Sequence, residues 1–255
     1  MKYIYGKVSD IGIVKDINQD KVEIISDVCM GHNVCMAIVC DGVGGLSQGE
    51  VASEFVVNQC RNWFNKRLEY YIIKENYINE IKDEWDSYIN NINLVLLEYG
   101  KKNNIKLGTT LCCMLLIDDE YLVANVGDSR AYLLSDELVQ ITKDQSLIQY
   151  ELDRGIITEN EAKNDTRKNV ILQSIGTCSV VKIDYYNGKL KSGNKLLMCT
   201  DGFRNCMGKE ELYKILGEKN YITDSEVEKD LFLTVDELKK RKERDNISAV
   251  LVEIL

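Results

Sequence analysis

The chain has 255 residues, of which 45% are hydrophobic and 29% charged, a composition that is ordinary for a globular protein. Its net charge of −9 argues against a nucleic-acid partner, which would need a basic surface. No apolar run approaches the roughly 18 residues of a membrane span. Residues 1–6 lack the apolar region of a signal peptide, so we expect a cytoplasmic protein with no membrane partner.

Nine cysteines and one histidine, His32, limit the chemistry of the chain. The cysteines form no C-x-x-C pair, and most lie inside apolar runs. They are therefore expected to be small core residues in a reducing compartment, not zinc ligands. His32 lies in a polar segment, where we expect a solvent-exposed loop side chain. Any Ser-His-Asp or Cys-His mechanism would depend on this single residue, which argues against both.

The first half of the chain predicts three strands followed by two long helices. Apolar and polar steps over residues 3–28 predict two strands joined around residues 15–20, and residues 34–41 predict a third. From Gly49 the apolar period becomes helical. The predicted apolar face consists of Val51, Phe55, Cys60, Trp63, Phe64, Leu68 and Tyr71. A second helical stripe follows, from Ile78 to Tyr99, with Gly100 as its expected stop.

The second half predicts two hairpins, a polar excursion, two more strands, two helices and a final strand. In chain order these are strands 111–117 and 121–126, strands 131–134 and 138–141, excursion 146–168, strands 180–186 and 195–200, helices 208–217 and 224–242, and strand 247–255. Because most neighbouring strands form hairpins, antiparallel sheets covered by helices are favoured over an alternating parallel order. The pattern contains no linker, so we expect one domain.

Four aspartates stand at the ends of predicted strands: Asp20, Asp41, Asp201 and Asp245. Asp41 alone also fits an ordinary turn, because glycines follow it and permit tight backbone folding. Four carboxylates that converged would repel one another, by roughly 4 kcal/mol for a pair about 4 Å apart at an effective dielectric near 20. Their convergence would therefore require cations. Oxygen ligands select Mg²⁺ or Mn²⁺, and two such ions bridged by a carboxylate form a hydrolytic site.

The chain also resembles the PP2C-type (PPM) metal-dependent serine/threonine phosphatases of bacteria, from about residue 5 to the C-terminus. Each of the motifs that carry this resemblance is weak alone, but together, in this order, they are specific. They are Gly12-x-Val14-Lys15-x-x-Asn18-Gln19-Asp20, Asp41-Gly42-Val43-Gly44-Gly45, Gly108-Thr109-Thr110, Asn125-Val126-Gly127-Asp128-Ser129-Arg130, Thr142-Lys143-Asp144-Gln145-Ser146, Thr200-Asp201-Gly202-Phe203 and Asp245-Asn246.

The resemblance implies a fold and a metal site. The fold would be α+β, a four-layer α-β-β-α sandwich of two antiparallel sheets flanked by pairs of helices. Residues 1–255 would form one phosphatase domain, with 146–168 as a flap beside the site. Two Mn²⁺ or Mg²⁺ ions would be bridged by Asp41, with the Gly42 carbonyl on one ion. The other ion would take Asp201 and Asp245 as ligands.

The resemblance also implies roles for further residues and shows where this chain departs from the family motifs. Asp20 would act through water in or just outside the metal coordination shell, and Asp128 would partly hold a third, weaker ion. Lys15 stands where the family usually has an arginine that grips the substrate phosphate. A lysine supplies the charge without the bidentate geometry. Val43 replaces a histidine proposed as general acid in animal members, and Gln145 replaces a histidine, which is expected to affect flap packing.

The implied function is a phosphoprotein phosphatase that hydrolyses phosphoserine and phosphothreonine by direct attack of a metal-activated hydroxide, without a covalent phospho-enzyme. Asp41 and Asp20 would be its catalytic residues and Lys15 its phosphate-binding residue. Its partners would be phosphorylated proteins, such as substrates of a Ser/Thr kinase. The oligomeric state is not set by the sequence, and a monomer is the simplest expectation. Two alternatives stay open: a non-catalytic PP2C-like binding or sensing module, and a phosphatase of small phosphoesters.

Overall fold

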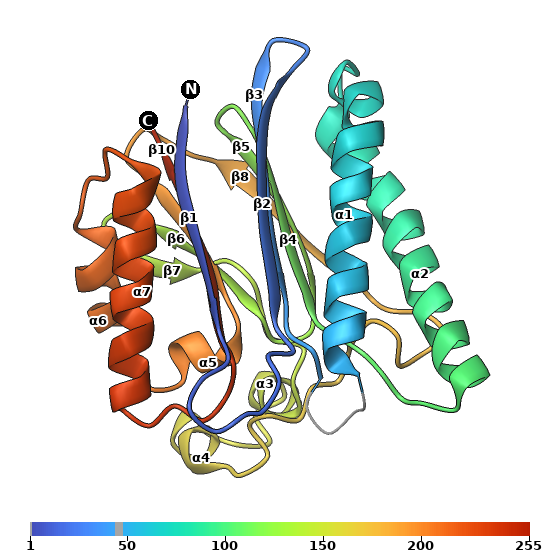
Figure 1. Cartoon of the computed structure of the whole chain (residues 1–255), viewed down its shortest axis with the longest axis vertical. Helices are drawn as coiled ribbons and strands as arrows, with labels where there is room; N and C mark the ends of the chain where they lie inside the picture. The colour runs from blue at the N-terminus through green and yellow to red at the C-terminus, as the bar shows by residue number, and fades with distance from the viewer. Residues whose placement is uncertain (1, 44–47) are drawn as a thin grey trace.

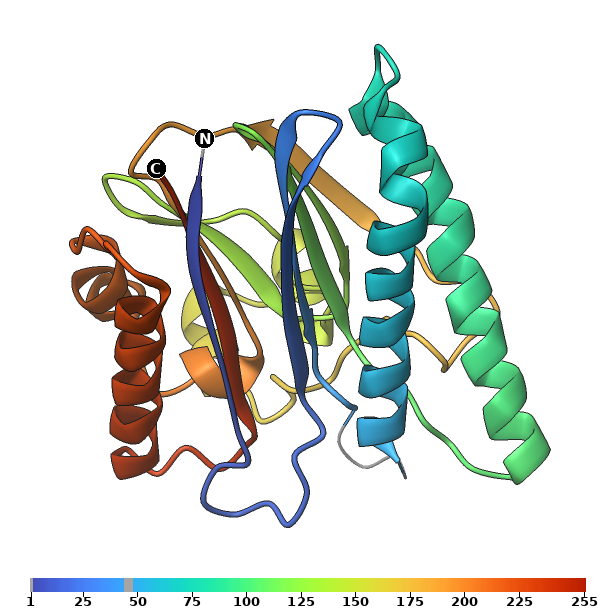
Figure 2. The ribbon, with the colours of Figure 1, turned by 45° about the horizontal axis from the view of Figure 1, so that its top comes forward.

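The computed structural model of the protein describes residues 2–43 and 48–255, so the predicted Gly44 and Gly45 lie outside the described residues. Two five-stranded sheets stack against each other, and helices cover both outer faces (Figure 1). In Figure 2 helices α1 and α2 lie on one side of the sheets, and α7 lies on the other. The implied four-layer α+β sandwich is confirmed.

All neighbouring strands in both sheets are antiparallel. In spatial order, the first sheet consists of β1 (Tyr3–Asp10), β10 (Ile247–Ile254), β9 (Lys195–Cys199), β6 (Arg130–Leu134) and β7 (Leu138–Gln140). The second consists of β2 (Lys21–Cys29), β3 (His32–Cys40), β4 (Leu111–Ile117), β5 (Glu120–Val126) and β8 (Asp184–Lys189). The predicted hairpins are therefore present.

Helices cover the sheets, and two short helices lie in the segment predicted to be the flap. The long ones are α1 (Gly49–Ile72), α2 (Tyr77–Asn103) and α7 (Asp224–Lys240). The short ones are α3 (Leu147–Asp153), α4 (Glu159–Asn164), α5 (Asp201–Arg204), α6 (Lys209–Leu212) and the π-helical turn η1 (Tyr213–Gly217). Ser146 and Thr158 cap α3 and α4, because each side-chain oxygen accepts a hydrogen bond from a first-turn backbone N–H. None of the described helices has the length and apolarity that a membrane crossing needs.

Three hydrophobic layers hold the sandwich together. One lies between α1, α2 and the second sheet, around Trp63 and Trp85. Another lies between the first sheet and α5, α6, η1 and α7, around Phe203 and Leu231. The third fills the space between the sheets, with Met114 at full burial. Because both faces of each central strand are covered, the sequences of these strands are continuous apolar runs.

The register of the second sheet places Asp20 beside Asp41. Lys21, the first residue of β2, lies opposite Cys40, the last residue of β3. Asp20 precedes the one and Asp41 follows the other, so both side chains belong to the same end of the sheet. In Figure 1 the β1–β2 loop, α3, α4 and α5 gather at this end.

The register of the first sheet brings three more aspartates to the same end. Cys199, the last residue of β9, lies opposite Ala249 of β10 on one side and the first residue of β6 on the other. Asp201 follows β9, Asp245 precedes β10, and Asp128 precedes β6. Sheet pairing alone therefore gathers residues that are more than a hundred positions apart in the sequence.

Two details of the predicted helices are wrong. Helix α2 continues through Gly100 and ends at Asn103, with Asn104 in the left-handed conformation at φ 54°. Gly100 instead allows the chain that follows the helix to pass close to it, because a Cβ at this position would lie 2.9 Å from the carbonyl oxygen of Ile105. Val51, predicted on the buried face of α1, is 39% exposed. Ala52 is buried in its place, while Cys60, Trp63, Phe64 and Leu68 are buried as predicted.

The strand predicted at 180–186 is also misplaced, because β8 occupies Asp184–Lys189 and pairs with β5. His32 is not a loop residue: it begins β3, and its Nδ1 lies 2.7 Å from Oδ2 of Asp118. This is the end of β3 opposite Asp41, so the histidine takes no part in the aspartate cluster. All nine cysteines are free, and six are buried, as expected for core residues.

Candidate metal centre

Asp41 is held at the end of β3 by its own backbone. Its N–H donates to Oγ1 of Thr110 at 2.9 Å, and its carbonyl oxygen accepts from the Thr110 N–H at 2.8 Å and the Thr109 hydroxyl at 2.9 Å. The next residue, Gly42, forms a bridge to Thr109. A Cβ on Gly42 would lie 2.7 Å from the Gln19 carbonyl oxygen, so only glycine fits there. The Gly108-Thr109-Thr110 motif thus fixes the strand end from which Asp41 projects.

Asp20 reaches the same point from the start of β2. Its side chain is almost fully buried, and Oδ2 accepts a hydrogen bond from the Thr200 hydroxyl at 3.0 Å. Thr200 belongs to the first sheet, so this contact joins the two sheets. Burial raises the pKa of Asp20 to about 7, and the charges of Asp201 and Asp245 act in the same direction, against the hydroxyls of Ser248 and Thr200.

Asp201 and Asp245 are brought together by close packing of α5 against the start of β10. Gly202 permits this approach, because a Cβ there would lie 2.1 Å from the carbonyl oxygen of Asn246. Asp245 is fixed by its Oδ1, which accepts from the Asn246 N–H at 2.9 Å. Burial raises the pKa of Asp201; Arg204 opposes this rise, and Asp245 adds to it. The two carboxylates therefore interact directly.

The five aspartates of the candidate site act on one another electrostatically. Burial holds the pKa of Asp41 well above its ordinary value, and the charges of Asp20, Asp201, Asp128 and Asp245 raise it further. All five carboxylates therefore share one region at the end of the sandwich. An array of like charges in a low-dielectric region is costly unless cations neutralise it.

Lys15 is the cation at the mouth of this cluster. Its Nζ lies 2.7 Å from Oδ1 of Asp245, and about a third of its side chain is exposed. Burial lowers the pKa of Lys15, but the hydrogen bond to Asp245 and the charges of Asp245, Asp41 and Asp201 raise it above its ordinary value. Lys15 thus stays charged and faces the aspartates, where an incoming anion would also meet it.

The donor set fits hard divalent ions. It consists of carboxylate and carbonyl oxygens, the ligands that Mg²⁺ and Mn²⁺ prefer. Within residues 2–43 and 48–255, however, no three acidic, thiol or imidazole side chains already surround a common point. Asp245 is turned towards Lys15, and Asp20 towards Thr200. Lys15 thus occupies one carboxylate oxygen of Asp245, Oδ1, which a metal ion would otherwise be able to contact.

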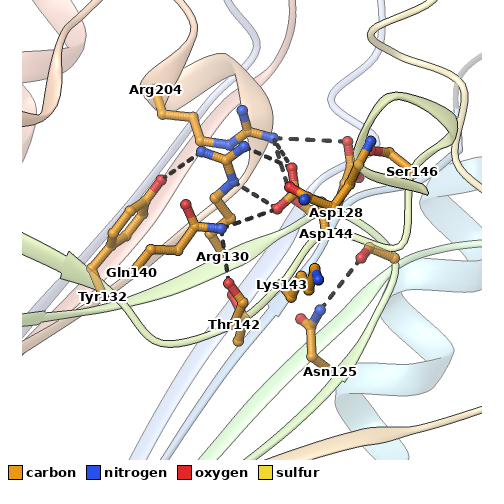
Figure 3. A network of polar contacts seen from close by, with 12 residues as sticks. Asn125, Asp128, Arg130, Tyr132, Gln140, Thr142, Lys143, Asp144, Ser146 and Arg204 are labelled. Carbon is orange, nitrogen blue, oxygen red and sulfur yellow. Dashed lines mark hydrogen bonds and ion pairs between the residues drawn. The ribbon is translucent and has the colours of Figure 1, made fainter. Parts of the chain in front are cut away.

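The sequence analysis missed a network beside Asp128 (Figure 3). Arg204, at the end of α5, donates from Nη2 to the Asp128 carbonyl oxygen at 3.2 Å. Arg130 forms a bidentate pair with Asp144, with both contacts at 2.7 Å. Burial raises the pKa of Asp128 to about 7, which Asp201 reinforces and Arg204 opposes. The sequence offers only a partial signal, because Arg204 follows Asp201 by three residues, the spacing of neighbours on a helical turn, and this spacing does not place Arg204 beside Asp128.

The flap is tied to the site through Gln145, the residue that departs from the family motif. Its Oε1 accepts from the Gly127 N–H at 2.9 Å, and its Nε2 donates to the Lys182 carbonyl at 3.1 Å and to Asp184 at 2.8 Å. These contacts agree with the expectation that this position affects flap packing. They connect α3, the loop before β6 and the entry to β8.

A pocket of about 410 Å³ opens between the flap and α5. Asp128, Asp201 and Arg204 line its inner wall. Its rim carries lysines from the flap and from α6, namely Lys163, Lys168 and Lys209. Within the described part of the chain, these three lysines form no ion pair with a carboxylate. The pocket thus combines an acidic inner wall with a basic rim.

Comparison with known proteins identifies the family of the chain. The sequence model of the family Protein phosphatase 2C matches residues 13–255, so the chain belongs to the protein phosphatase 2C family. The serine/threonine phosphatase stp of Listeria innocua is 31% identical over 221 residues, which cover 86% of this chain and 84% of that protein.

Solved structures share the fold over the whole chain. The serine/threonine phosphatase of S. agalactiae is 26% identical, with a TM-score of 0.87 and complete coverage of both chains. The catalytic domain of the serine/threonine protein phosphatase PstP, in complex with two manganese ions, is 24% identical. Its TM-score is 0.78, and the match covers 98% of this chain and 97% of that one.

Proposed function

We propose that this protein is a metal-dependent phosphatase that removes phosphate from phosphoserine and phosphothreonine in cytoplasmic phosphoproteins. The observation that carries the proposal is the convergence of Asp20, Asp41, Asp201 and Asp245, each of which follows or precedes a strand end at one edge of the sandwich. Membership of the protein phosphatase 2C family supports it. The manganese ions in the PstP structure support a site for two divalent ions.

The residues of this chain would have the following roles in metal binding and hydrolysis. The carboxylates of Asp41, Asp201 and Asp245 and the carbonyl oxygen of Gly42 would hold the ions, with Asp41 as their shared ligand. When bound, such ions lower the pKa of a water molecule and draw charge from phosphate oxygens. Asp20, oriented by the Thr200 hydroxyl, would position water at the site. His32 lies at the far end of β3, so the leaving oxygen would take its proton from solvent at the site.

Lys15 is proposed to bind the substrate phosphate. Replacement by Met removes a charged hydrogen bond and is expected to raise KM for an aryl phosphate roughly tenfold, with a smaller change in kcat. Replacement by Arg restores a bidentate fork and should lower KM below that of the wild type. Steady-state kinetics on the three proteins check this. Equal KM values for wild type and Lys15→Met would show that Lys15 only pairs with Asp245.

The basic rim of the pocket predicts which phosphoproteins fit. Lys163 and Lys168 carry unpaired charges beside the aspartate cluster, so we expect phosphopeptides with acidic flanking residues to be preferred. The double variant Lys163→Glu/Lys168→Glu should raise KM for an acid-flanked phosphothreonine peptide several-fold and leave KM for an aryl phosphate unchanged. Lys229→Glu, an exposed position on α7, is the matched control. Equal KM values for acidic and neutral peptides in the wild type would contradict the preference.

One observation favours the binding or sensing module as a second candidate. The contact of Lys15 with Asp245 leaves the coordination shell open. Release of inorganic phosphate from a phosphothreonine peptide in the presence of Mn²⁺ separates the candidates. Multiple turnovers support the phosphatase, whereas binding without release supports the module. Turnover of an aryl phosphate but of no phosphopeptide would instead indicate a phosphatase of small phosphoesters.

A further inference from the structure

Arg204 places a fixed positive charge beside Asp128, at the edge of the aspartate cluster (Figure 3). Besides its hydrogen bond to the Asp128 carbonyl, Nη2 of Arg204 lies 3.8 Å from Oδ2 of Asp128. Only 14% of the Arg204 side chain and 9% of the Asp128 side chain are exposed. The contact is therefore part of the interior, where screening by solvent is weak.

Asp144 does not need the charge of Arg204, although Nη2 of Arg204 is 3.8 Å from its Oδ2. Arg130 already donates hydrogen bonds to both carboxylate oxygens of Asp144 at 2.7 Å, and Nε2 of Gln140 donates to Oδ1 at 3.3 Å. A bidentate pair of this kind is among the strongest charge-assisted contacts in proteins. The charge of Arg204 is therefore available chiefly to Asp128, which it contacts, and it also opposes the negative charge of Asp201. With two aspartates and two arginines, this corner is neutral without any bound ion.

The rest of the cluster is not balanced in this way. Asp20, Asp41, Asp201 and Asp245 together carry four potential negative charges. Among the described residues, Lys15 is the cation that forms an ion pair with one of these four carboxylates, that of Asp245. The uncompensated charge that attracts divalent ions therefore lies around Asp41 and not around Asp128.

We propose that Arg204 takes the place of the third, weaker ion at Asp128, so that the protein binds two divalent ions per site and not three. The inference rests on the proposed metal centre. An ion ligated by Asp128 would sit roughly 2.1 Å from a carboxylate oxygen. It would then face a guanidinium of like charge only a few ångströms away. Arginine does not lose its proton at any working pH, so the charge is permanent.

Equilibrium dialysis of the purified full chain against Mn²⁺, with the bound metal measured directly, tests this without reference to activity. The wild type and Asp128→Asn are both expected to saturate near two ions. Arg204→Gln should take up one further ion, bound roughly tenfold or more tightly than any additional Mn²⁺ on the wild type. The double variant Arg204→Gln/Asp128→Asn should lose that ion again. Arg204→Lys keeps the charge and should match the wild type.

Three outcomes would overturn the inference. A third ion on the wild type that is lost in Asp128→Asn would show that Arg204 does not replace it, and this comparison stands even if Arg204→Gln fails to fold. A folded Arg204→Gln protein that still binds two ions would show that Arg204 does not exclude the third. Absence of Mn²⁺ binding in every protein would remove the proposed metal centre as well, so the two failures are distinguishable.

Discussion

Replacement of Asp41 by Asn is expected to lower Mn²⁺-dependent hydrolysis of an aryl phosphate by two to three orders of magnitude. Asn keeps the shape of the side chain but lacks the negative charge. Burial and the charges of Asp20, Asp201, Asp128 and Asp245 all raise the pKa of Asp41, so its carboxylate is strongly coupled to the cluster. Without that charge, neither of the proposed ions keeps its shared ligand. The initial rate at saturating Mn²⁺ is the quantity to measure.

Two further variants make this result specific. Asp201→Asn removes a proposed ligand of one ion and should cause a loss of the same order. Asp136→Asn changes an exposed carboxylate in the β6–β7 turn and should leave the rate unchanged. Activity of Asp41→Asn within a few-fold of the wild type would refute the two-ion mechanism. Melting of the variants without metal shows whether they are folded, so a loss of rate can be assigned to the site.

Mn²⁺ is expected to raise the melting temperature, and EDTA to lower it again. A ligand that binds only the folded state stabilises it by about 2.7 kcal/mol at a concentration a hundred times its Kd. For a domain of this size, each kcal/mol corresponds to about 2–4 °C. The expected shift is therefore roughly 5–10 °C, measured by thermal unfolding at fixed protein concentration. A melting curve that does not respond to Mn²⁺ or EDTA would argue against converging carboxylates.

The stability of the metal-free protein is also expected to depend on pH. The pKa of Asp20 is raised to about 7 in the folded state, chiefly by burial. A carboxylate of this kind contributes stability below its unfolded pKa, near 4, and loses that contribution as pH rises through about 7. The metal-free wild type should therefore lose stability between pH 5.5 and pH 8 relative to Asp20→Asn. A difference that grows in the other direction would contradict the raised pKa.

The positions of the aspartates could be predicted from the sequence because each lies within two residues of an apolar strand. Asp20 and Asp41 flank paired strand ends, and the antiparallel register, itself a consequence of hairpin connections, brings them side by side. Asp201 and Asp245 follow the same logic in the other sheet. The strand pattern thus allowed the four side chains to converge at one edge, and the family resemblance assigned them to one metal site.

The Arg204 network could not be predicted in the same way. Helix α5 is only four residues long, too short for a periodic signal, and its direction is set by the contact of Gly202 with Asn246. Arg130 begins β6 and Asp144 lies four residues beyond the end of β7, so their contact depends on the path of the chain after the hairpin. Gly100 was misread for a similar reason, because tertiary contact with the returning chain, not helix termination, calls for a glycine there.

Diffraction data collected at the manganese absorption edge, from crystals equilibrated with Mn²⁺, would test the central claim most directly. Two anomalous difference peaks are expected, both in contact with the Asp41 carboxylate, with Asp245 turned away from Lys15 to reach one of them. A saturated crystal with no peak at Asp41, or with manganese bound only elsewhere on the molecule, would contradict the account.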